Sequence, residues 1–326
     1  MSASIDRRVI VVLNATSAQG NGVVAALLND PKTQWTIRAV TRDASTPWAE
    51  EFRNRYQAAK DRVSLVSADV YDIRSLRTAF SGAYGVFAMI IELLPGKRLV
   101  LPEEIRHEVD AGVNIVDMAK QCGVKHFVMN SLPDMANATS GRFTQMYHMD
   151  HKFEVEQYAR KELDCVTSVI PADGIVRFCA PFPSDKKTQW VDPAYDVGIF
   201  AAKIFDLGPA KTAGKVYPVL SPMVNMDEMA ATFTRVTGRK AIHVPLSHDK
   251  WADMTASMIG PAFREDVKEM MEWTSMAPAD KVCYGALDPE EDISAKELGV
   301  TASTFEDWMK RSGWTGPTEV FCENAA

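Results

Sequence analysis

One stretch of the chain, residues 9–24 with the sequence VIVVLNATSAQGNGVV, places a strand, a turn of small residues and a helix in immediate succession. Residues 9–13 are all apolar, which is typical of a strand buried on both faces in a parallel sheet. Val23, Val24 and Leu27 then follow at helical spacing. This order brings free backbone N–H groups and the positive end of a helix to the carboxyl edge of a sheet, where they can bind a pyrophosphate.

The turn departs from the usual G-x-G-x-x-G fingerprint of dinucleotide-binding folds. Asn14 and Ser17 stand where glycines are expected, while Gly20 and Gly22 remain. Asn tolerates a positive φ better than other residues except Gly, so Asn14 can hold the turn. Ser17 adds a hydroxymethyl group where the backbone should approach phosphate, and it either crowds the ligand or donates a hydrogen bond to it. The alternative is an ordinary strand-to-helix turn with no ligand.

Alternating strand and helix signals continue after this turn. We expect strands at 35–40, 63–66, 84–91, 124–129 and 165–170, and helices at 47–59, 103–121 and 147–162 between them. Repeated strand–helix units with short connections predict a parallel sheet with helices on both faces. The expected fold class is therefore α/β, with a Rossmann-type doubly wound sheet.

The pattern changes after residue 171. Residues 171–190 are rich in Pro, Gly and aromatic residues, which suits a loop over a pocket. Helices are expected at 227–237 and, with many methionines that favour core filling over an adaptable pocket, at 251–276. A short extended piece is expected at 243–245. The tetrapeptide Ser303-Thr304-Phe305-Glu306 fits a capping box that opens a last short helix.

These segments suggest a division of the chain into two parts. We expect a nucleotide-binding Rossmann domain at 1–170, to which a helix and a strand within 191–220 add. The remainder of 171–326 is expected to form a smaller α+β lobe on the substrate side. A single large core is well within reach of a chain of 326 residues.

Charge and composition narrow the class of protein. A net charge of −7 and a pI near 5.5 argue against direct binding of nucleic acid. No apolar run reaches the roughly 20 residues of a membrane span, and the N-terminus has no signal-peptide core. The five cysteines are scattered and never form a C-x-x-C pair, which favours a reducing compartment over disulfides or a metal site. We therefore expect a cytoplasmic protein without a bound metal.

The ends of the predicted strands carry the candidate cofactor contacts. Arg42 follows the second strand, where an acidic residue usually holds the ribose of NAD and an Arg accommodates the 2′-phosphate of NADP. Asp43 comes next, so NAD(H) stays open, but we favour NADP(H). Asp69 and Val70 follow the third strand and would border the adenosine, and Asn130 ends the fifth strand on the same edge. The alternatives are a solvated loop cation at Arg42 and, for the residues after the third strand, ordinary packing at the end of the sheet.

Lys152 is the main catalytic candidate. Short-chain dehydrogenases use Tyr-x-x-x-Lys on one helix, because residues four apart share a helix face. In this chain the residue four before Lys152 is His148, while Tyr147 points elsewhere on the helix. His148 can act as an acid or base near neutral pH, with Lys152 hydrogen-bonded to a ribose. The alternative is a helix whose charged side chains are simply solvated.

Several stretches together resemble the NmrA-like family of atypical short-chain dehydrogenases. They include VIVVLNATSAQGNGVV, IRAVTRD, VKHFVMNS and HMDHKFEVEQYAR, and the resemblance runs from about Val9 to Phe205. It implies a Rossmann domain with a small lobe and NADP(H) or NAD(H) in the cleft between them. Carried over residue by residue, it would place Thr16, Gln19 and Gly20 at the pyrophosphate. It would place Arg42 at the 2′-phosphate and Lys152 at the nicotinamide ribose.

The family includes proteins with different functions. Some members are reductases, some are dinucleotide sensors that regulate a protein partner, and related proteins catalyse non-redox rearrangements. We expect an NADP(H)-dependent reductase of a small apolar metabolite of the natural-product type, with Lys152 and His148 supplying the proton and the 171–190 loop, through Phe178, Phe182 and Trp190, covering the substrate. A sensor with a regulatory protein partner and a non-redox enzyme remain the alternatives. The sequence indicates neither the substrate nor an oligomeric state.

Overall fold

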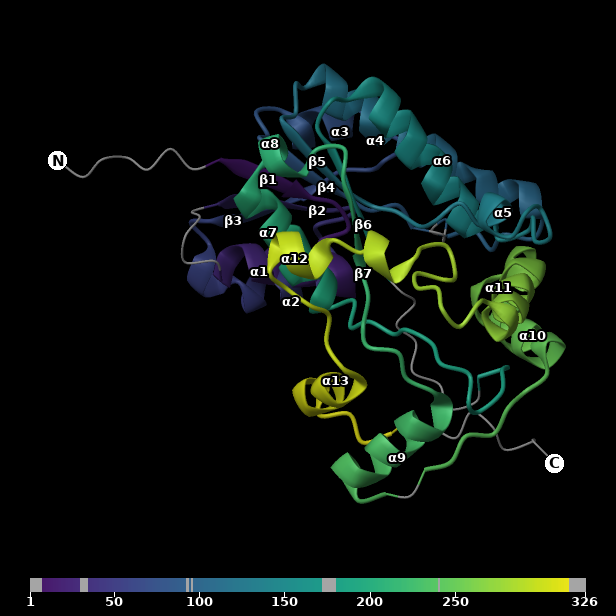
Figure 1. Ribbon diagram of the computed structural model, residues 1–326. Coiled ribbons are helices and arrows are strands. Elements are labelled where there is room, and N and C mark those ends of the chain that lie inside the picture. The colour runs from purple at the N-terminus through teal and green to yellow at the C-terminus, as the bar shows by residue number, and fades with distance from the viewer. Residues whose placement is uncertain are drawn as a thin grey trace.

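The computed structural model describes residues 8–29, 35–91, 94, 96–171, 180–239 and 241–316. At its centre is a seven-stranded, fully parallel sheet in the order β3-β2-β1-β4-β5-β6-β7 (Figure 1). The strands are β1 (Val9–Val12), β2 (Thr36–Thr41), β3 (Val63–Ser67), β4 (Gly85–Ala88), β5 (His126–Asn130), β6 (Val166–Pro171) and β7 (Val216–Val219). This sheet confirms the expected α/β, Rossmann-like fold.

Strand β1 lies where the direction of winding reverses. Its residue Ile10 pairs with Ile37 of β2 on one side and with Gly85 of β4 on the other. The chain therefore runs outward from β1 to β3 and then returns to continue in the opposite direction from β4. In open α/β sheets, ligands bind in the crevice outside the carboxyl ends of the strands at such a switch point. Here that crevice lies beyond β1 and β4.

Two layers of helices cover the two faces of the sheet (Figure 1). On one face are α3 (Ile73–Phe80), α4 (His107–Gln121) and α6 (Tyr147–Glu162), and on the other are α1 (Ala18–Asn29), α2 (Pro47–Arg55) and α7 (Asp196–Leu207). Successive residues of a strand point to opposite faces. Val11 of β1 accordingly belongs to the core shared with α3, α4 and α6, while Ile10 and Val12 belong to the core shared with α1 and α7. Two short helices, α5 (Met135–Ala138) and α8 (Pro209–Thr212), lie in connections.

Helices α1 and α7 meet at glycines. A Cβ atom on Gly22 would lie 2.2 Å from the carbonyl oxygen of Ala194, and one on Gly198 would lie 2.4 Å from the carbonyl oxygen of Gly22. Real side chains do not approach backbone this closely, so both positions require glycine for the helices to pack as they do. Helix α1, which follows the turn after β1, is therefore packed directly against α7 and the residues before it.

The first turn of α7 is itself held by the C-terminal part of the chain. Ser303 donates to Asp196 Oδ1 from its backbone N–H over 3.0 Å and from its Oγ over 2.6 Å. Arg311 Nη2 lies 2.7 Å from Asp192 Oδ2, and its guanidinium stacks 4.0 Å over the Tyr195 ring. These contacts join segments that lie more than 100 residues apart in the chain.

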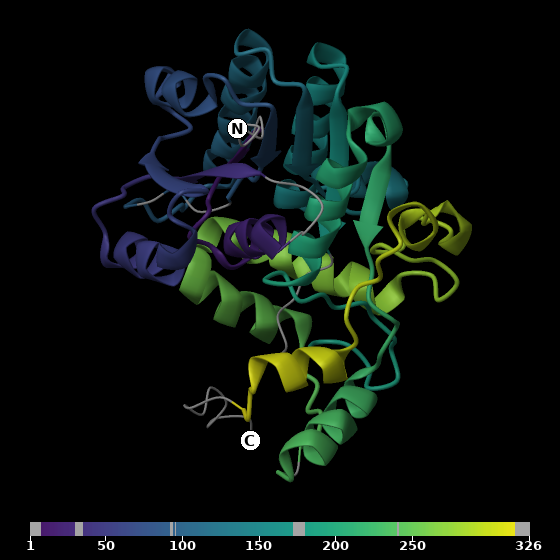
Figure 2. The ribbon, with the colours of Figure 1, turned by 90° about the vertical axis from the view of Figure 1, so that its left-hand side faces the viewer.

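The helices α9 (Met226–Thr237), α10 (His248–Ile259), α11 (Arg264–Met276) and α13 (Phe305–Ser312) gather beyond the carboxyl edge of the sheet, as Figure 2 shows. The short helix α12 (Ser294–Leu298) instead packs beside β7 and α7. In the described part of this region, β structure after β7 is limited to the isolated bridges Thr188↔Val224 and Val282↔Leu287. The lobe is thus mainly helical, whereas β7 and α7 lie with the sheet. The proposed boundary between the two parts stays a prediction.

Some expected elements differ from the structure. The helix expected at 251–276 is divided into α10 and α11 because Gly260 adopts a φ of +131° and Pro261 follows it. Strand β4 ends at Ala88, three residues before the expected end at 91. The extended piece expected at 243–245 belongs to none of the described helices and strands, and no strand was expected there. The last capping box is formed by Thr304 and Asp307, because Ser303 is bonded to Asp196 instead.

The structure describes three of the five cysteines, and what it shows of membrane-spanning helices likewise concerns only the described residues. Cys122, Cys165 and Cys283 are free thiols, while Cys179 and Cys322 lie outside the described residues. Within the described ranges, no helix combines the length and the apolar character that crossing a bilayer requires.

Candidate functional site

A cavity of about 560 Å³ opens at the switch point of the sheet. Its walls come from the residues that follow β1, β2, β3 and β4, together with the side of α4. Five of the residues singled out from the sequence line it: Asn14, Thr16, Arg42, Asp69 and Val70. Cavities of this size accommodate a drug-sized or nucleoside-sized molecule. The predicted cofactor contacts from three separate strands therefore converge on one cavity.

Asn14 holds the turn after β1 in the way its residue type predicts. Its φ is +49°, in the left-handed region that favours Gly and tolerates Asn. Its side-chain Nδ2 donates to the carbonyl oxygen of Met89 over 3.0 Å. Because Met89 follows β4, this bond ties together the two strand ends that form the crevice. Asn14 thus shapes the floor of the cavity with both its backbone and its amide.

Ser17 caps the helix that follows. Its Oγ accepts a hydrogen bond from the N–H of Gly20 over 3.2 Å, and its own N–H donates to the carbonyl oxygen of Asn14 over 2.9 Å. The hydroxyl therefore accepts a hydrogen bond from one of the N–H groups at the start of α1 that have no partner within the helix. Gly20 is required here for a different reason, because a Cβ would lie 2.2 Å from the Asn14 carbonyl oxygen. Thr16 is exposed at the cavity wall.

Gln19 and Asn130 do not line this cavity but contact each other. Asn130 Nδ2 donates to Gln19 Oε1 over 2.8 Å, which joins α1 to the carboxyl end of β5. Asn130 is only 5% exposed, and its Oδ1 has no hydrogen-bond partner within the described part of the chain. A buried acceptor without a partner is unfavourable unless a ligand or a water donates to it. The pair therefore continues the candidate site from the turn toward β5.

Arg42 and Asp43 take different orientations after β2. Arg42 is exposed and lines the cavity, whereas Asp43 does not. The Asp43 carboxylate instead accepts from the Oγ and the N–H of Ser45, over 2.6 and 2.8 Å, and these bonds hold its pKa below its usual value. The arrangement presents a cation, not a carboxylate, to a ligand at this corner.

The side of the cavity after β3 is bordered by Asp69, Val70 and Tyr71. Asp69 Oδ1 accepts from the N–H of Tyr71 over 2.9 Å, so its carboxylate stabilises the turn after β3. The Tyr71 hydroxyl lies 2.6 Å from His107 Nδ1, and burial raises the pKa of Tyr71 to about 12. Val70 supplies an apolar wall, which suits the face of a base.

Lys152 is deeply buried on α6 and does not line the cavity. It is 3% exposed, and its Nζ lies 3.9 Å from Oε2 of Glu108, a fully buried residue of α4. Its carbonyl oxygen accepts from Ser131 Oγ over 3.5 Å, which places the lysine beside the end of β5. The sequence analysis did not single out Glu108, because an acidic residue in a helical stretch is usually solvated. Contact between Lys152 and a nicotinamide ribose stays a prediction.

His148 is paired with a residue that the sequence did not indicate. Its Nδ1 lies 2.8 Å from both carboxylate oxygens of Asp266, which is 1% exposed in the first turn of α11. The two residues are 118 positions apart, so no local pattern could have revealed the pair. An imidazole whose Nδ1 is held by a buried carboxylate has a fixed orientation, and the carboxylate favours a proton on Nδ1. This contact also links α6, which packs on the sheet, to α11 of the lobe.

The neighbouring His151 is not part of this pair. Its ring stacks on Tyr147 with centroids 6.2 Å apart, and burial lowers its pKa.

The predicted loop over the substrate is only partly described. Phe182 and Trp190 line a second cavity, also of about 560 Å³, inside the lobe, while Phe178 lies outside the described residues.

The chain matches known proteins over nearly its whole length. An oxidoreductase of Aspergillus hancockii, hkm9, is 30% identical over 344 residues, which cover 93% of this chain and 96% of hkm9. The solved structure of NmrA, a negative transcriptional regulator, in complex with NADP has a TM-score of 0.65 at 22% identity and covers 95% and 93% of the two chains.

The triphenylmethane reductase of Citrobacter sp., solved with NADP(H), has a TM-score of 0.65 at 18% identity and covers 93% and 99% of the two chains. At this level of identity, both solved structures show a shared fold. The model of the NmrA-like family matches residues 6–309. Together with the switch-point cavity and the relative from Aspergillus hancockii, this match shows that the chain belongs to the NmrA-like family.

Proposed function

We propose that this chain is an NADP(H)-dependent reductase of a small apolar metabolite. The observation that carries the proposal is the switch-point cavity, in which the Asn14 turn and the exposed Arg42 face the same space. The description of hkm9 as an oxidoreductase and the presence of NADP(H) in the triphenylmethane reductase structure support it. An Arg at the end of β2 favours NADP(H) over NAD(H) because it can pair with a 2′-phosphate.

The residues of the site fit this cofactor. Gly20 leaves room for the close turn, and the unpaired Oδ1 of buried Asn130 offers an acceptor to a ligand donor such as a ribose or carboxamide group. The turn at 14–20 would hold the pyrophosphate, Arg42 the 2′-phosphate, and Asp69 with Val70 the adenosine. Lys152, near the end of β5, would hold the nicotinamide ribose.

Bound NADPH would supply a hydride to the carbon of a carbonyl or imine group. The proton for the oxygen or nitrogen of that group comes from Nε2 of protonated His148. Asp266 accepts the Nδ1–H throughout, so the imidazole that remains is the neutral tautomer with its proton on Nδ1. Solvent then returns the proton to Nε2. Glu108 compensates the charge of Lys152 inside the protein and keeps the lysine in place.

A dinucleotide-sensing regulatory protein is the main alternative. It is favoured by His148 standing where the catalytic Tyr of short-chain dehydrogenases is expected, and by the burial of Lys152 against Glu108. The related NmrA is described as a negative transcriptional regulator. A protein partner captured only in the presence or absence of NADP(H), without turnover, would support this alternative. A non-redox enzyme would show neither NADPH oxidation nor such a partner.

The first experiment is a titration of the purified protein with NADPH and with NADH, followed by nicotinamide fluorescence and by calorimetry. We expect tight binding of NADPH and weak binding of NADH. Failure of both to bind would contradict the assignment of the cavity and would mean that Ser17 closes the phosphate site. A screen of aromatic carbonyl and imine compounds for NADPH oxidation then identifies a substrate.

With a substrate in hand, Asp266→Asn tests the acid–base assignment. Loss of the charged partner of His148 is expected to lower kcat roughly tenfold to a hundredfold, with KM changed little and the pH profile of kcat altered. Glu269→Gln is the matched control, because this carboxylate on the same helix bonds to Gln145, over 2.8 Å to its N–H, and not to His148. Equal effects of the two variants, or unchanged turnover in Lys152→Ala, would contradict the proposed roles.

A further inference from the structure

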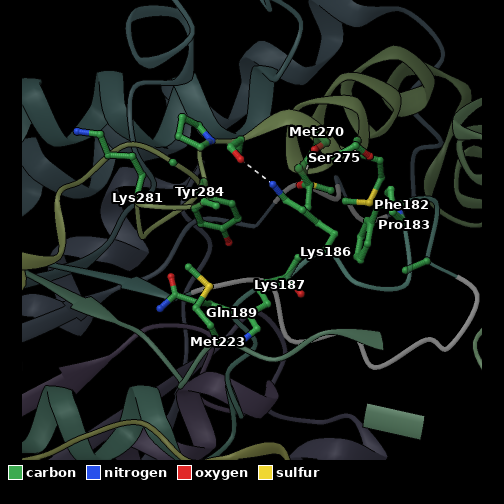
Figure 3. Close-up of a pocket in the computed structure, with 18 of the residues that line it drawn as sticks. Phe182, Pro183, Lys186, Lys187, Gln189, Met223, Met270, Ser275, Lys281 and Tyr284 are labelled. Carbon is green, nitrogen blue, oxygen red and sulfur yellow. Dashed lines mark hydrogen bonds between the residues drawn. The ribbon is translucent and has the colours of Figure 1, made fainter. Parts of the chain in front are cut away.

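The cavity inside the lobe is separate from the nucleotide cavity. It is formed by the segment 180–190, by the C-terminal half of α11 and by the segment 277–285, as Figure 3 shows. It shares no lining residue with the switch-point cavity, and none of Asn130, His148 and Lys152 lines it. Its volume of about 560 Å³ is that of a small-molecule site.

Its walls are aromatic and thioether side chains. Phe182 and Trp190 come from the segment 180–190. Met223 follows β7 and Met270 lies on α11, while Tyr284 lies across the cavity from Phe182. Methionine side chains adapt to irregular apolar ligands, and aromatic rings stack on flat ones. These walls therefore suit a flat, largely apolar molecule.

The backbone at Tyr284 is held in an unusual conformation. Cys283 and Tyr284 have consecutive positive φ values of +50° and +60°, which are costly for residues other than Gly. The conformation is stabilised by the Val282↔Leu287 bridge and by a hydrogen bond from Trp273 Nε1 to the Tyr284 carbonyl oxygen. An unfavourable backbone conformation is therefore maintained at the point where Tyr284 lines the cavity.

Lys186 brings one charge into this apolar space. Figure 3 shows its side chain crossing the cavity, between Tyr284 on one side and Phe182 and Met270 on the other. Its Nζ donates to the carbonyl oxygen of Ala277 over 2.6 Å, at the C-terminal end of α11, and burial lowers its pKa. Within the described residues it has no carboxylate partner. An ammonium group has three donors, so this single bond leaves capacity for a ligand.

The other lysines at the cavity differ from Lys186. Lys281 forms an ion pair with Asp288 over 2.6 Å, which neutralises its charge. Lys187 is exposed and can be solvated. Asp185, also exposed, is the acidic residue among those that line the cavity. A protein of net charge −7 therefore places an excess of cations around an apolar cavity.

We propose that the lobe cavity binds a flat, aromatic molecule that carries one anionic group, a carboxylate, sulfonate or phenolate, and that Lys186 binds this group. The rings lie among Phe182, Trp190 and Tyr284, and the anion accepts hydrogen bonds from the ammonium beside the Ala277 carbonyl. This inference goes beyond the reductase proposal and does not depend on it, because no residue of the nucleotide cavity takes part.

Two fluorescent probes that differ in charge test the proposal. 1-Anilinonaphthalene-8-sulfonate is aromatic and anionic, and N-phenyl-1-naphthylamine is its neutral counterpart. We expect wild-type protein to bind the anionic probe at least tenfold more tightly than the neutral one. In Lys186→Met the affinity for the anionic probe should fall roughly tenfold or more, because a charged hydrogen bond is lost, while the affinity for the neutral probe changes by less than about threefold.

Two further variants locate the bound probe. Lys281→Met is the matched control, since its ion pair with Asp288 already compensates its charge, and it should leave both affinities within about threefold of wild type. Thr274→Phe adds a ring to the cavity wall and should reduce binding of both probes. Near-ultraviolet circular dichroism and the Tm establish that each variant is folded.

Three outcomes would overturn the proposal. They are equal losses in the two lysine variants, binding of both probes to folded Thr274→Phe with unchanged affinity, and displacement of the anionic probe by saturating NADPH. The last result would place the probe in the nucleotide cavity. Failure of NADPH to bind at all would refute the reductase proposal and would leave the probe experiment unaffected.

Discussion

The two cavities have the same volume and are built in opposite ways. The switch-point cavity is formed where four parallel strands end, around a turn fixed by the backbone of Asn14 and Gly20, with the exposed Arg42 on its wall. The lobe cavity is lined by side chains of loops and of α10 and α11, with no residue of the seven strands among its described lining. The shape of the switch-point cavity depends mainly on the backbone conformation of the turn. The shape of the lobe cavity depends mainly on which side chains fill the space.

This difference predicts opposite responses to mutation. Where backbone makes the site, an added methyl group should do more harm than the removal of a side chain. Where side chains make the site, substitution should change which ligand binds before it changes the fold.

The largest effect is expected for Gly20→Ala. The new Cβ would lie 2.2 Å from the Asn14 carbonyl oxygen, so α1 must move away from the turn. We expect the free energy of unfolding to fall by about 3 kcal/mol and NADPH binding to be lost. Urea denaturation and an NADPH titration measure both. Gly123→Ala is the control, because its φ of +66° is strained but no atom lies within 4 Å of the new Cβ, and it should cost about 1 kcal/mol. Similar results for the two variants would contradict the view that backbone determines this site.

The central sheet contains a buried histidine that should make stability depend on pH. His126 on β5 is fully buried, and burial lowers its pKa from 6.5 to about 4. The unfolded chain binds this proton below pH 6.5 and the folded chain does not until about pH 4, so stability is lost as pH falls through this window. Between pH 7 and pH 5 the loss should be about 2 kcal/mol. His126→Gln should flatten the dependence, and an unchanged slope of urea midpoint against pH would show that His126 is not its source.

Arg42→Ala removes the exposed cation without disturbing the backbone. NADPH affinity should fall roughly tenfold, because one charge-assisted contact with phosphate is lost, while NADH affinity and Tm stay as in wild type. Arg38→Ala is a useful contrast. Its Nη1 donates to the carbonyl oxygens of Ala79 and Ser81 over 2.6 and 2.8 Å, so its loss should lower Tm without selecting between the nucleotides. Equal weakening of NADPH and NADH in Arg42→Ala would remove its role as the selector.

The smallest effect is expected for Ser17→Gly. The variant loses the bond from Gly20 N–H to Ser17 Oγ, which should cost about 0.5 kcal/mol of stability. It also frees that N–H for phosphate, so affinity for NADPH should rise a fewfold. Paired melting and titration experiments measure the two changes. Weaker nucleotide binding in this variant would mean that the Ser17 hydroxyl itself contacts the phosphate.

The parts of the molecule that sequence could predict are those set by neighbouring residues. The helix expected at 147–162 has the bounds of α6, and the positive φ expected at Asn14 is present. Both follow from local periodicity or from the preference of a single residue type. The fold class followed because repeated strand–helix units leave few ways to arrange a sheet.

The parts that could not be predicted depend on contacts between distant segments. Asp266 meets His148 across 118 residues, and Glu108 reaches Lys152 from another helix. Ser303 was expected to cap its own helix, but it bonds to Asp196, and Thr304 takes its place. The division of one expected helix at Gly260 likewise reflects the approach of Leu99, whose carbonyl oxygen would lie 2.8 Å from a Cβ at that position. Periodicity in a single chain carries no information about such partners.

The support of α1 by α7 has a consequence for how the protein matures. The turn at 14–20 leaves the ribosome early. The start of α7, however, is held by contacts with Ser303 and Arg311, which are translated far later. A growing chain can therefore pair its first strands before the contacts that brace the turn exist. If the proposed function holds, competence to bind a nucleotide would therefore arise late in synthesis, after the C-terminal residues have reached α7.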